Sequence, residues 1–348
     1  MSSPSQSTPT SKQQFWRGNW PMLLALFLAL ALVVAVLVGA KLVYEKAAKQ
    51  PVAMSVLDTP DANSAECADF VATLPEELLG LDRAELVEPA PNGAAAWQQD
   101  SQTRITLRCG VDLPLQYNAL SLISEQSGTH WLEVADTTPQ STMRTWYSVN
   151  RWPVVAITAD DASAPHTAPT GELSAAMDSL EVRQAAFNPT PLAQLTTAIE
   201  AGGTSGGSEG ADLAQRCEDL LASLPETFGT GPTYTAIDAI DTTENGPKAQ
   251  ALEGYSRAWV APGHEAVVIR CAVDFPQSYE AGAQLQQINE IAWFEDTTLG
   301  NGTTASVWYG LGRDIILAVS TPQAAVDSVL VPAGEALVEH SSPQEGEL

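Results

Sequence analysis

Few residues of this chain have both the type and the spacing that catalysis requires. Residues 203–207 (GTSGG) match the Gly-x-Ser-x-Gly pattern of a nucleophile elbow, but that motif needs a strand before the serine and a helix after it. The pattern lies instead in a Gly/Ser-rich stretch, which is typical of a flexible linker. Asp238, Asp241 and Glu244 could hold a weakly bound Ca²⁺, although a solvated loop is the simpler interpretation.

Aromatic and guanidinium side chains are better candidates, and they suit binding rather than catalysis. Tryptophan and arginine side chains can line a groove that holds a glycan or a peptide. The alternative is a core built on large aromatic rings, with arginine stacked on them or bridging strand ends. The residues of the predicted groove are Trp131, Trp146, Arg151, Trp293, Trp308 and Arg313.

These residues belong to an internal repeat, in which twelve residues reappear with unchanged types 162 positions later. The first series is Trp97, Arg108, Cys109, Val111, Asp112, Pro114, Tyr117, Trp131, Glu133, Trp146, Tyr147 and Arg151. No histidine is shared, since His130 corresponds to Ala292, so a site common to both copies cannot use histidine as a general base. Asp112 and Asp274 are shared acids, but Asp112 directly precedes Leu-Pro, which favours a turn-capping role.

The chain has four cysteines, two in each copy, and four cysteines allow three pairings. The repeat selects the pairs Cys67–Cys109 and Cys217–Cys271, each of which would join an opening helix to a strand. Metal ligation would need clustered soft ligands, but each copy has two cysteines and the chain has no Cys-x-x-Cys. Disulfides require an oxidising compartment, which predicts that both copies lie outside the cytoplasm.

One apolar segment precedes the repeats. Residues 21–40 (PMLLALFLALALVVAVLVGA) contain no charged residue and have about the length that crosses a ~30 Å hydrocarbon core as a helix. We predict a transmembrane helix at 19–43, a cytoplasmic tail at 1–18, and a single-pass cell-membrane protein with most of its chain extracytoplasmic. The alternative is a signal peptide cleaved near Ala40, which would release a secreted protein.

Each copy has the pattern of a small α+β domain with a mostly antiparallel sheet, although the strand order is not readable. The predicted units are 63–182 and 211–331, with a Gly/Ser-rich linker at 183–210 and an acidic, disordered tail at 332–348. Helices are predicted over 64–73, 213–223, 171–179 and 322–329, and strands over 104–110, 266–272, 154–158 and 315–320.

The charge balance excludes one class of partner. After Gln50 the chain has 11 basic and 41 acidic residues, and such a surface repels the phosphate backbone of nucleic acid. The sequence has no Walker loop and no Gly-x-Gly-x-x-Gly, and we expect no cofactor and no metal. The expected partners are the membrane, through the N-terminal helix, and an envelope protein or cell-wall glycan.

Several segments resemble one family of actinobacterial envelope proteins, domain of unknown function 3515. They are Cys-x6-Leu-Pro on the opening helix, Ala-Trp before the LRCG-type strand, the proline after that cysteine, and the aromatic-x3-Arg-x-Pro segment at 147–153. The two tandem copies depart from the single copy usual in the family, and Gln98 and Val260 stand where a glycine is expected. The resemblance implies secretion or membrane anchoring and no catalytic activity.

These observations favour a non-catalytic envelope module that binds a partner protein or a glycan, with two copies providing avidity through the linker. The alternatives are an envelope-acting enzyme of unknown class and a structural or assembly factor.

Overall fold

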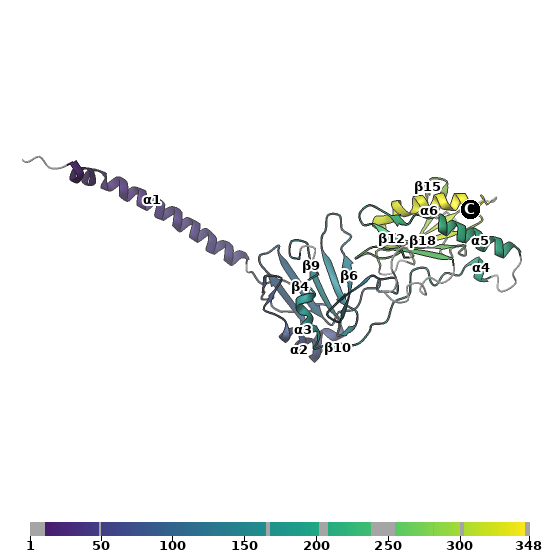
Figure 1. The fold of residues 1–348 in the computed structure, drawn as a ribbon, viewed down its shortest axis with the longest axis horizontal. Helices are drawn as coiled ribbons and strands as arrows, with labels where there is room; N and C mark the ends of the chain where they lie inside the picture. The colour runs from purple at the N-terminus through teal and green to yellow at the C-terminus, as the bar shows by residue number, and fades with distance from the viewer. Residues whose placement is uncertain are drawn as a thin grey trace, which may run out of the picture.

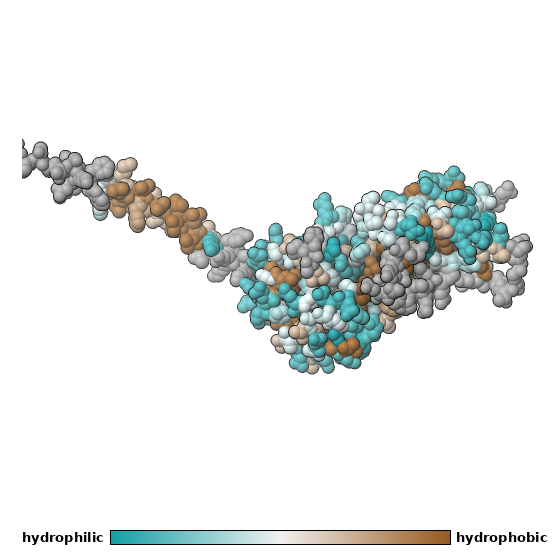
Figure 2. Space-filling model, viewed as in Figure 1, coloured by the Kyte–Doolittle hydropathy of each residue, from teal (hydrophilic) through white to brown (hydrophobic). Residues whose placement is uncertain are grey.

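A computed structural model describes residues 11–48, 50–164, 168–201, 208–237, 255–280, 282–299 and 303–344. The long helix α1 (Ser11–Ala48) extends away from the rest of the chain (Figure 1). Its segment Trp20–Lys41 has a mean hydropathy of 3.0 and none of it is buried, so its apolar side chains form the brown stretch in Figure 2. The helix could cross a membrane by length and composition, as a signal sequence also could, and it begins inside the predicted tail 1–18.

The first unit follows α1. Its helices are η1 (Pro60–Asn63), α2 (Ala65–Thr73), η2 (Gly171–Leu173) and α3 (Ser174–Met177). Its strands are β1 (Glu77–Leu78), β2 (Leu81–Arg83), β3 (Ala94–Gln98), β4 (Arg104–Cys109), β5 (Ile123–Gln126), β6 (Thr129–Ala135), β7 (Arg144–Ser148), β8 (Arg151–Trp152), β9 (Val155–Ala159) and β10 (Glu181–Val182).

The second unit repeats the order of the strands of the main sheet. Its helices are α4 (Ala198–Ala201), α5 (Ser208–Ser223), η5 (Gln323–Ala325) and α6 (Val326–His340). Its strands are β11 (Thr227–Phe228), β12 (Tyr234–Ala236), β13 (Ser256–Val260), β14 (Val267–Cys271), β15 (Leu285–Ile288), β16 (Ile291–Asp296), β17 (Ala305–Leu311) and β18 (Leu317–Pro322).

The two main sheets have the same topology. The first is ordered β1-β2-β3-β4-β9-β7-β6-β5 and the second β11-β12-β13-β14-β18-β17-β16-β15. Every pair of neighbouring strands is antiparallel. The predicted α+β class, with two tandem helix-plus-antiparallel-sheet domains after an N-terminal helix, is therefore confirmed.

Local sequence explains how the first unit begins. The Ser64 side chain accepts a hydrogen bond from the Cys67 backbone N–H, which caps α2. Pro75, shortly beyond the helix, cannot continue it. Along β4 the side chains alternate, so that Ile105 and Leu107 are buried while Thr106 and Arg108 are half-buried. This period of two gives the sheet one apolar face and one polar face.

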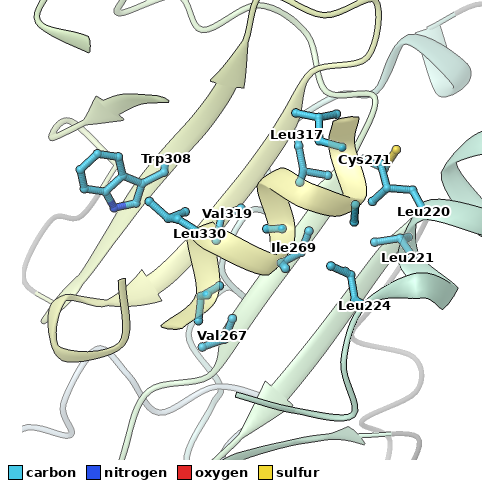
Figure 3. Packing of buried hydrophobic residues seen from close by; sticks show 14 of the residues in the cluster. Leu220, Leu221, Leu224, Val267, Ile269, Cys271, Trp308, Leu317, Val319 and Leu330 are labelled. Atoms are coloured by element: carbon cyan, nitrogen blue, oxygen red, sulfur yellow. The ribbon is translucent and has the colours of Figure 1, made fainter. Parts of the chain in front are cut away.

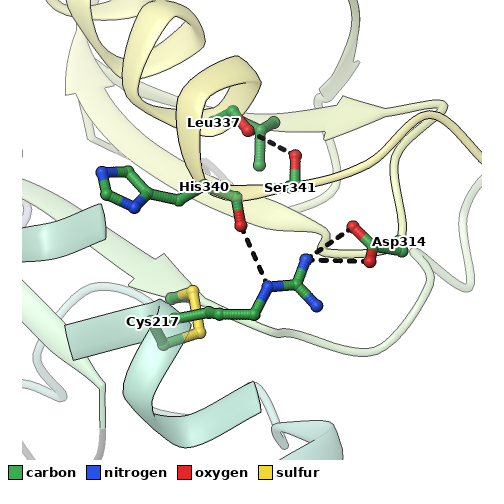
Figure 4. Close-up of a disulfide and its surroundings, with 7 residues drawn as sticks. Cys217, Asp314, Leu337, His340 and Ser341 are labelled. Carbon is green, nitrogen blue, oxygen red and sulfur yellow. Dashed lines mark hydrogen bonds and ion pairs between the residues drawn. A yellow bond between two sulfur atoms is a disulfide. The ribbon is translucent and has the colours of Figure 1, made fainter. Parts of the chain in front are cut away.

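The helices of each unit cover the apolar face of its own sheet. In the second unit Val267, Ile269 and Val319 pack with leucines of α5 and α6 (Figure 3). Disulfides join Cys67 of α2 to Cys109 of β4, and Cys217 of α5 to Cys271 of β14, as predicted, with Cα atoms 5.5 and 5.7 Å apart. Beside the second disulfide, Arg216 donates to the His340 carbonyl and pairs with Asp314 at 2.8 Å, which joins α5 to the end of α6 (Figure 4).

The predicted disordered tail at 332–348 is wrong for residues 332–340, which continue α6. Pro332 lies inside this helix and removes one backbone hydrogen bond, but the helix continues beyond it. Ala333, Ala336 and Leu337 are buried against the sheet, and this burial stabilises the turns after the proline. Residues 341–344 then return to the sheet, where Pro343 forms a bridge with Arg313.

The predicted linker at 183–210 is also wrong for much of its described length. The Asn188 N–H donates to the Tyr117 carbonyl, Leu192 is 2% exposed, and Thr197 forms a bridge with Val273. The helix α5 begins at Ser208, before the predicted boundary at residue 211. The described part of this segment is therefore packed structure, because its leucines and prolines find an apolar surface to cover.

That surface belongs to the second unit. Leu120 of the first unit and Leu192 of the connecting segment lie in one apolar cluster with the face of the second sheet that its helices leave uncovered. The backbone N–H of Ala135 donates to the carbonyl of Gly263 at 2.8 Å, which adds a direct link between the units. Figure 1 shows the two units with their helices on opposite sides, which is consistent with the first unit meeting the second on its helix-free face.

Candidate functional site

The predicted aromatic groove is wrong in both units, because its tryptophans are core residues. Trp131 and Trp293 are 1% and 0% exposed, and Trp146 and Trp308 are 5% and 7% exposed. All four lie on the sheet faces that the helices cover. The physical reason is their volume: large rings at every second strand position fill the space between a sheet and its helices.

The two arginines of the predicted groove are mostly buried, and each interacts with residues near the C-terminal end of its own unit. Arg151 is 7% exposed, donates to Thr129 Oγ1 and the Gly128 carbonyl, and lies 3.6 Å from Asp178. Arg313 is 8% exposed and donates to the Val338 carbonyl at 2.9 Å. Neither guanidinium faces an open cleft, so both act in folding.

The acidic and catalytic candidates do not come together. Asp274 accepts a hydrogen bond from Thr196 Oγ1, which anchors the connecting segment, whereas Asp112 is exposed. Within the described ranges no three His, Cys, Asp or Glu side chains approach closely enough to hold a metal ion. The Gly-x-Ser-x-Gly pattern at 203–207 and the acids Asp238, Asp241 and Glu244 lie outside the described residues.

A different site emerges from the sheet face that carries no helix, which we call the open face. In the first unit this face carries a row of threonines on three adjacent strands, because Thr106 pairs with Thr158 and Thr158 with Thr145. The hydroxyls of Thr145 and Thr158 are 2.9 Å apart and hydrogen-bonded. The next row toward the disulfide contains Arg108, Ala156 and Tyr147.

The residues between α1 and the first unit run along this face. We call residues 50–59 the strap. Val52 of the strap is 3% exposed and bridges Leu86, while Gln98 Nε2 donates to the Gln50 carbonyl at 2.8 Å. Ser55 lies against the open face, where Arg108 Nη2 donates to its hydroxyl at 3.4 Å. The strap therefore forms one wall of a hollow over the sheet.

Two adjoining hollows lie between the strap and the threonine row. The first, of about 370 Å³, is lined by Leu57, Thr59, Thr106, Arg108, Val111, Asp112, Thr145, Tyr147, Ala156 and Thr158. The second, of about 820 Å³, continues past Arg104 and Met143 to Asp160. Together they make a channel with hydroxyl, guanidinium and carboxylate groups on its floor and rim.

Two arginines line this channel. Within the described residues Arg104 and Arg108 of β4 have no carboxylate within 4 Å, which is also true of Arg183 and Arg313, but Arg104 and Arg108 face the hollows. Partial burial lowers the pKa of the Arg108 guanidinium from its ordinary value, yet an arginine stays charged in proteins. Burial also raises the pKa of the Tyr147 phenol, which is thus neutral and can donate a hydrogen bond.

In the described part of the second unit the equivalent face is covered where the first unit has its channel. Val268 and Val307 stand where the first unit has Thr106 and Thr145, and they are 1% and 5% exposed beneath the first unit and the connecting segment. A pocket of about 350 Å³ remains at the margin of this cover. The charged side chain in its described lining is Glu265, which already accepts from the Thr304 N–H at 2.8 Å.

Comparison with protein families decides the identity of the repeat. The model of a family described as a protein of unknown function, DUF3515, matches residues 26–186 and again residues 197–345. The chain belongs to the DUF3515 family. Its two DUF3515 segments coincide with the two sheets and include the connecting residues after 197, which agrees with the packed structure found there. Comparison with curated proteins and with solved structures found no match.

The threonine row was missed by sequence reasoning, although a signal for it exists. Most residues that the two copies of the DUF3515 repeat share are core residues. Two positions differ in polarity between the copies: Thr106 corresponds to Val268, and Thr145 to Val307. At these positions the sheet face of the second unit is covered and that of the first unit is open. Comparing the copies for differences would have pointed to this face.

Proposed function

We propose that this DUF3515 protein is a membrane-tethered, extracytoplasmic binding module, and that its ligand site is the open face of the first unit. The apolar helix supports tethering, and an apolar run longer than a usual signal core supports its retention. Two disulfides support an oxidising location for both units, with the N-terminus on the cytoplasmic side.

The divergence of the two copies is the observation that carries this proposal. The two sheets have the same topology, but their helix-free faces are covered differently. The first unit and the connecting segment cover the second unit's face, whereas the strap and the cluster around Tyr117 and Leu132 cover the first unit's face only in part. A helix-free face of an antiparallel sheet can simply be polar because it meets water. The first unit's face differs from that expectation in being hollowed beneath the strap and in carrying two arginines that have no carboxylate partner within the described residues.

The absence of shared catalytic geometry favours binding over an enzyme. Asp112 at the channel rim has no carboxylate or histidine partner among the residues that line the same hollow. General acid–base chemistry needs two such groups placed across a substrate. The two copies do not offer two equal sites for avid binding, because the first unit and the connecting segment cover the helix-free face of the second unit.

A co-sedimentation experiment tests the proposal with a matched pair of variants. The variant T106V/T145V copies residues that the second unit already carries at the equivalent strand positions, so the fold should accept them. We expect the full chain in phosphatidylcholine nanodiscs to co-sediment with an insoluble cell-envelope fraction, and T106V/T145V to lose at least about four-fifths of that binding.

The control is T227V, which makes the same chemical change at an exposed strand residue of the second unit, and it should bind like the unaltered chain. Equal sedimentation of all three proteins, or of none, would contradict the proposed site.

A further inference from the structure

We infer that the open face of the first unit binds a sugar chain that carries carboxylate groups, which deepens and rests on the function proposed above. The ligand would lie in the channel beneath the strap, with its carboxylates on Arg104 and Arg108 and its hydroxyls on the threonine row. Four features of the channel support this ligand class.

The first feature is the pair of arginines. Arg104 and Arg108 lie on the same strand and point to the same face, and each is separated from Thr106 by one residue. Their Cα atoms are about 13 Å apart along the strand, since each residue of a strand rises by about 3.3 Å. A planar guanidinium binds a carboxylate through two parallel N–H···O bonds. Two guanidinium groups at this separation suit two carboxylates on different parts of a ligand better than one group with several negative charges.

The second feature is the hydroxyl row between them. Thr106, Thr158 and Thr145 lie on neighbouring strands, about 4.8 Å apart across the sheet. A threonine hydroxyl both donates and accepts hydrogen bonds, as each hydroxyl of a sugar ring does. Thr59 of the strap adds an Oγ1 atom that is buried and has no hydrogen-bond partner within the described chain. Such a group costs free energy unless a ligand or a water satisfies it.

The third feature is the acidic rim. Asp58 is in the strap, and Asp112 and Asp160 line the two hollows. A continuous polyanion such as nucleic acid would place phosphates against these carboxylates. A phosphate monoester carries a charge of about −1.5 to −2 at neutral pH, so it would be repelled more than a carboxylate with a single charge. The rim therefore disfavours phosphate groups and favours a ligand that is rich in hydroxyls and whose charges are single carboxylates.

The fourth feature is the position of the channel along the chain. Ser55 contacts Arg108 and follows the last residue of α1, Ala48, by seven residues. Seven extended residues span at most about 25 Å, so the channel would lie close to the end of the membrane helix. A ligand in it would be held near the outer surface of the membrane, where envelope sugar chains are available.

Direct binding measurements can separate this inference from the broader proposal. The protein is the full chain in phosphatidylcholine nanodiscs, and the method is isothermal titration calorimetry. The probes are hexagalacturonate, its fully methyl-esterified form, which has the same sugars without charge, and glucose 6-phosphate. We expect hexagalacturonate to bind at least about tenfold more tightly than the ester, and glucose 6-phosphate not to displace it.

Two variants locate the charge. R104Q/R108Q should remove the preference for the charged probe, whereas R183Q, which removes an exposed guanidinium elsewhere, should leave it unchanged. T106V/T145V should weaken both sugar probes. Thermal melting of each variant establishes that it is folded before its binding is measured.

Each contrary outcome has its own meaning. If both hexamers bind equally and T106V/T145V weakens both, the carboxylate inference is overturned while the binding face stands. If glucose 6-phosphate displaces hexagalacturonate, the ligand is a phosphate and the inference is overturned. If neither hexamer binds but co-sedimentation still depends on the threonines, the sugar class is wrong and the proposed function survives.

Discussion

Replacing Cys217 and Cys271 together with alanine is expected to lower the free energy of unfolding of the second unit by about 4 kcal/mol. The disulfide closes a loop with a sequence separation of 54, so in the chain-entropy model its removal enlarges the unfolded ensemble considerably. The bond also fixes α5 against β14, where Leu220 and Leu224 enter the core. The measurement is urea-induced unfolding followed by circular dichroism.

The first unit supplies the matched comparison. C67A/C109A opens a loop with a sequence separation of 42 and should destabilise the first unit by a similar amount. Dithiothreitol should shift the unaltered chain toward the variants and should leave a variant lacking both disulfides unchanged. If dithiothreitol did not change the unfolding curve of the unaltered chain, the structural role of these bonds would be contradicted.

Replacing Leu120 and Leu192 together with alanine is expected to lower the free energy of unfolding of the second unit by roughly 4 kcal/mol. The two leucines are 0% and 2% exposed, and they cover the face of the second sheet that its own helices leave bare. Truncating each buried leucine costs transfer free energy and leaves a cavity beside Val268 and Val307. Urea unfolding measures the loss, and increased binding of an apolar dye reports the uncovered face.

Leu115 provides the control for this variant. It lies in the same loop as Leu120 but is 49% exposed, so L115A should change the free energy of unfolding by no more than about 0.5 kcal/mol. A double variant L120A/L192A as stable as L115A would mean that the first unit and the connecting segment do not support the second sheet.

The parts of the fold that sequence predicted well are those fixed by local or repeated signals. Ser64 and Pro75 mark the two ends of α2, and the recurrence of Cys67 and Cys109 at Cys217 and Cys271 selected the disulfides. These features need no knowledge of long-range packing, because capping, helix termination and pairing by homology act through residue type and position.

The errors came where tertiary burial overrode a local signal. Pro332 and the acidic composition around it favoured a disordered tail, yet Leu337 is fully buried and α6 continues to His340. The stretch around Leu192 contains two prolines and leads into Gly/Ser-rich sequence, which favoured a linker, but an apolar sheet face elsewhere in the chain orders it. In both cases the deciding partner lies far away in sequence, so no local pattern could reveal it.

The candidate site was missed for a related reason. Trp131 and Trp293 each end an apolar segment and lead into an acidic, threonine-rich loop, which favoured a groove, but residues that recur in both copies belong mostly to the common core. The threonine row lies at positions where the copies differ, and whether such residues are available to a ligand depends on which sheet face is covered. That information comes from the arrangement of the units rather than from residue types.

Hydrogen exchange of the full chain in nanodiscs, with and without the cell-envelope fraction, tests the location of the binding face most directly. The strap at residues 50–59 has few backbone hydrogen bonds beyond those of Val52, so its amides should exchange quickly in the free protein. We expect the envelope fraction to slow exchange in the strap and at the edges of the first unit's channel, while exchange in the second unit is unchanged. Slower exchange confined to the second unit, or none in the strap, would contradict it.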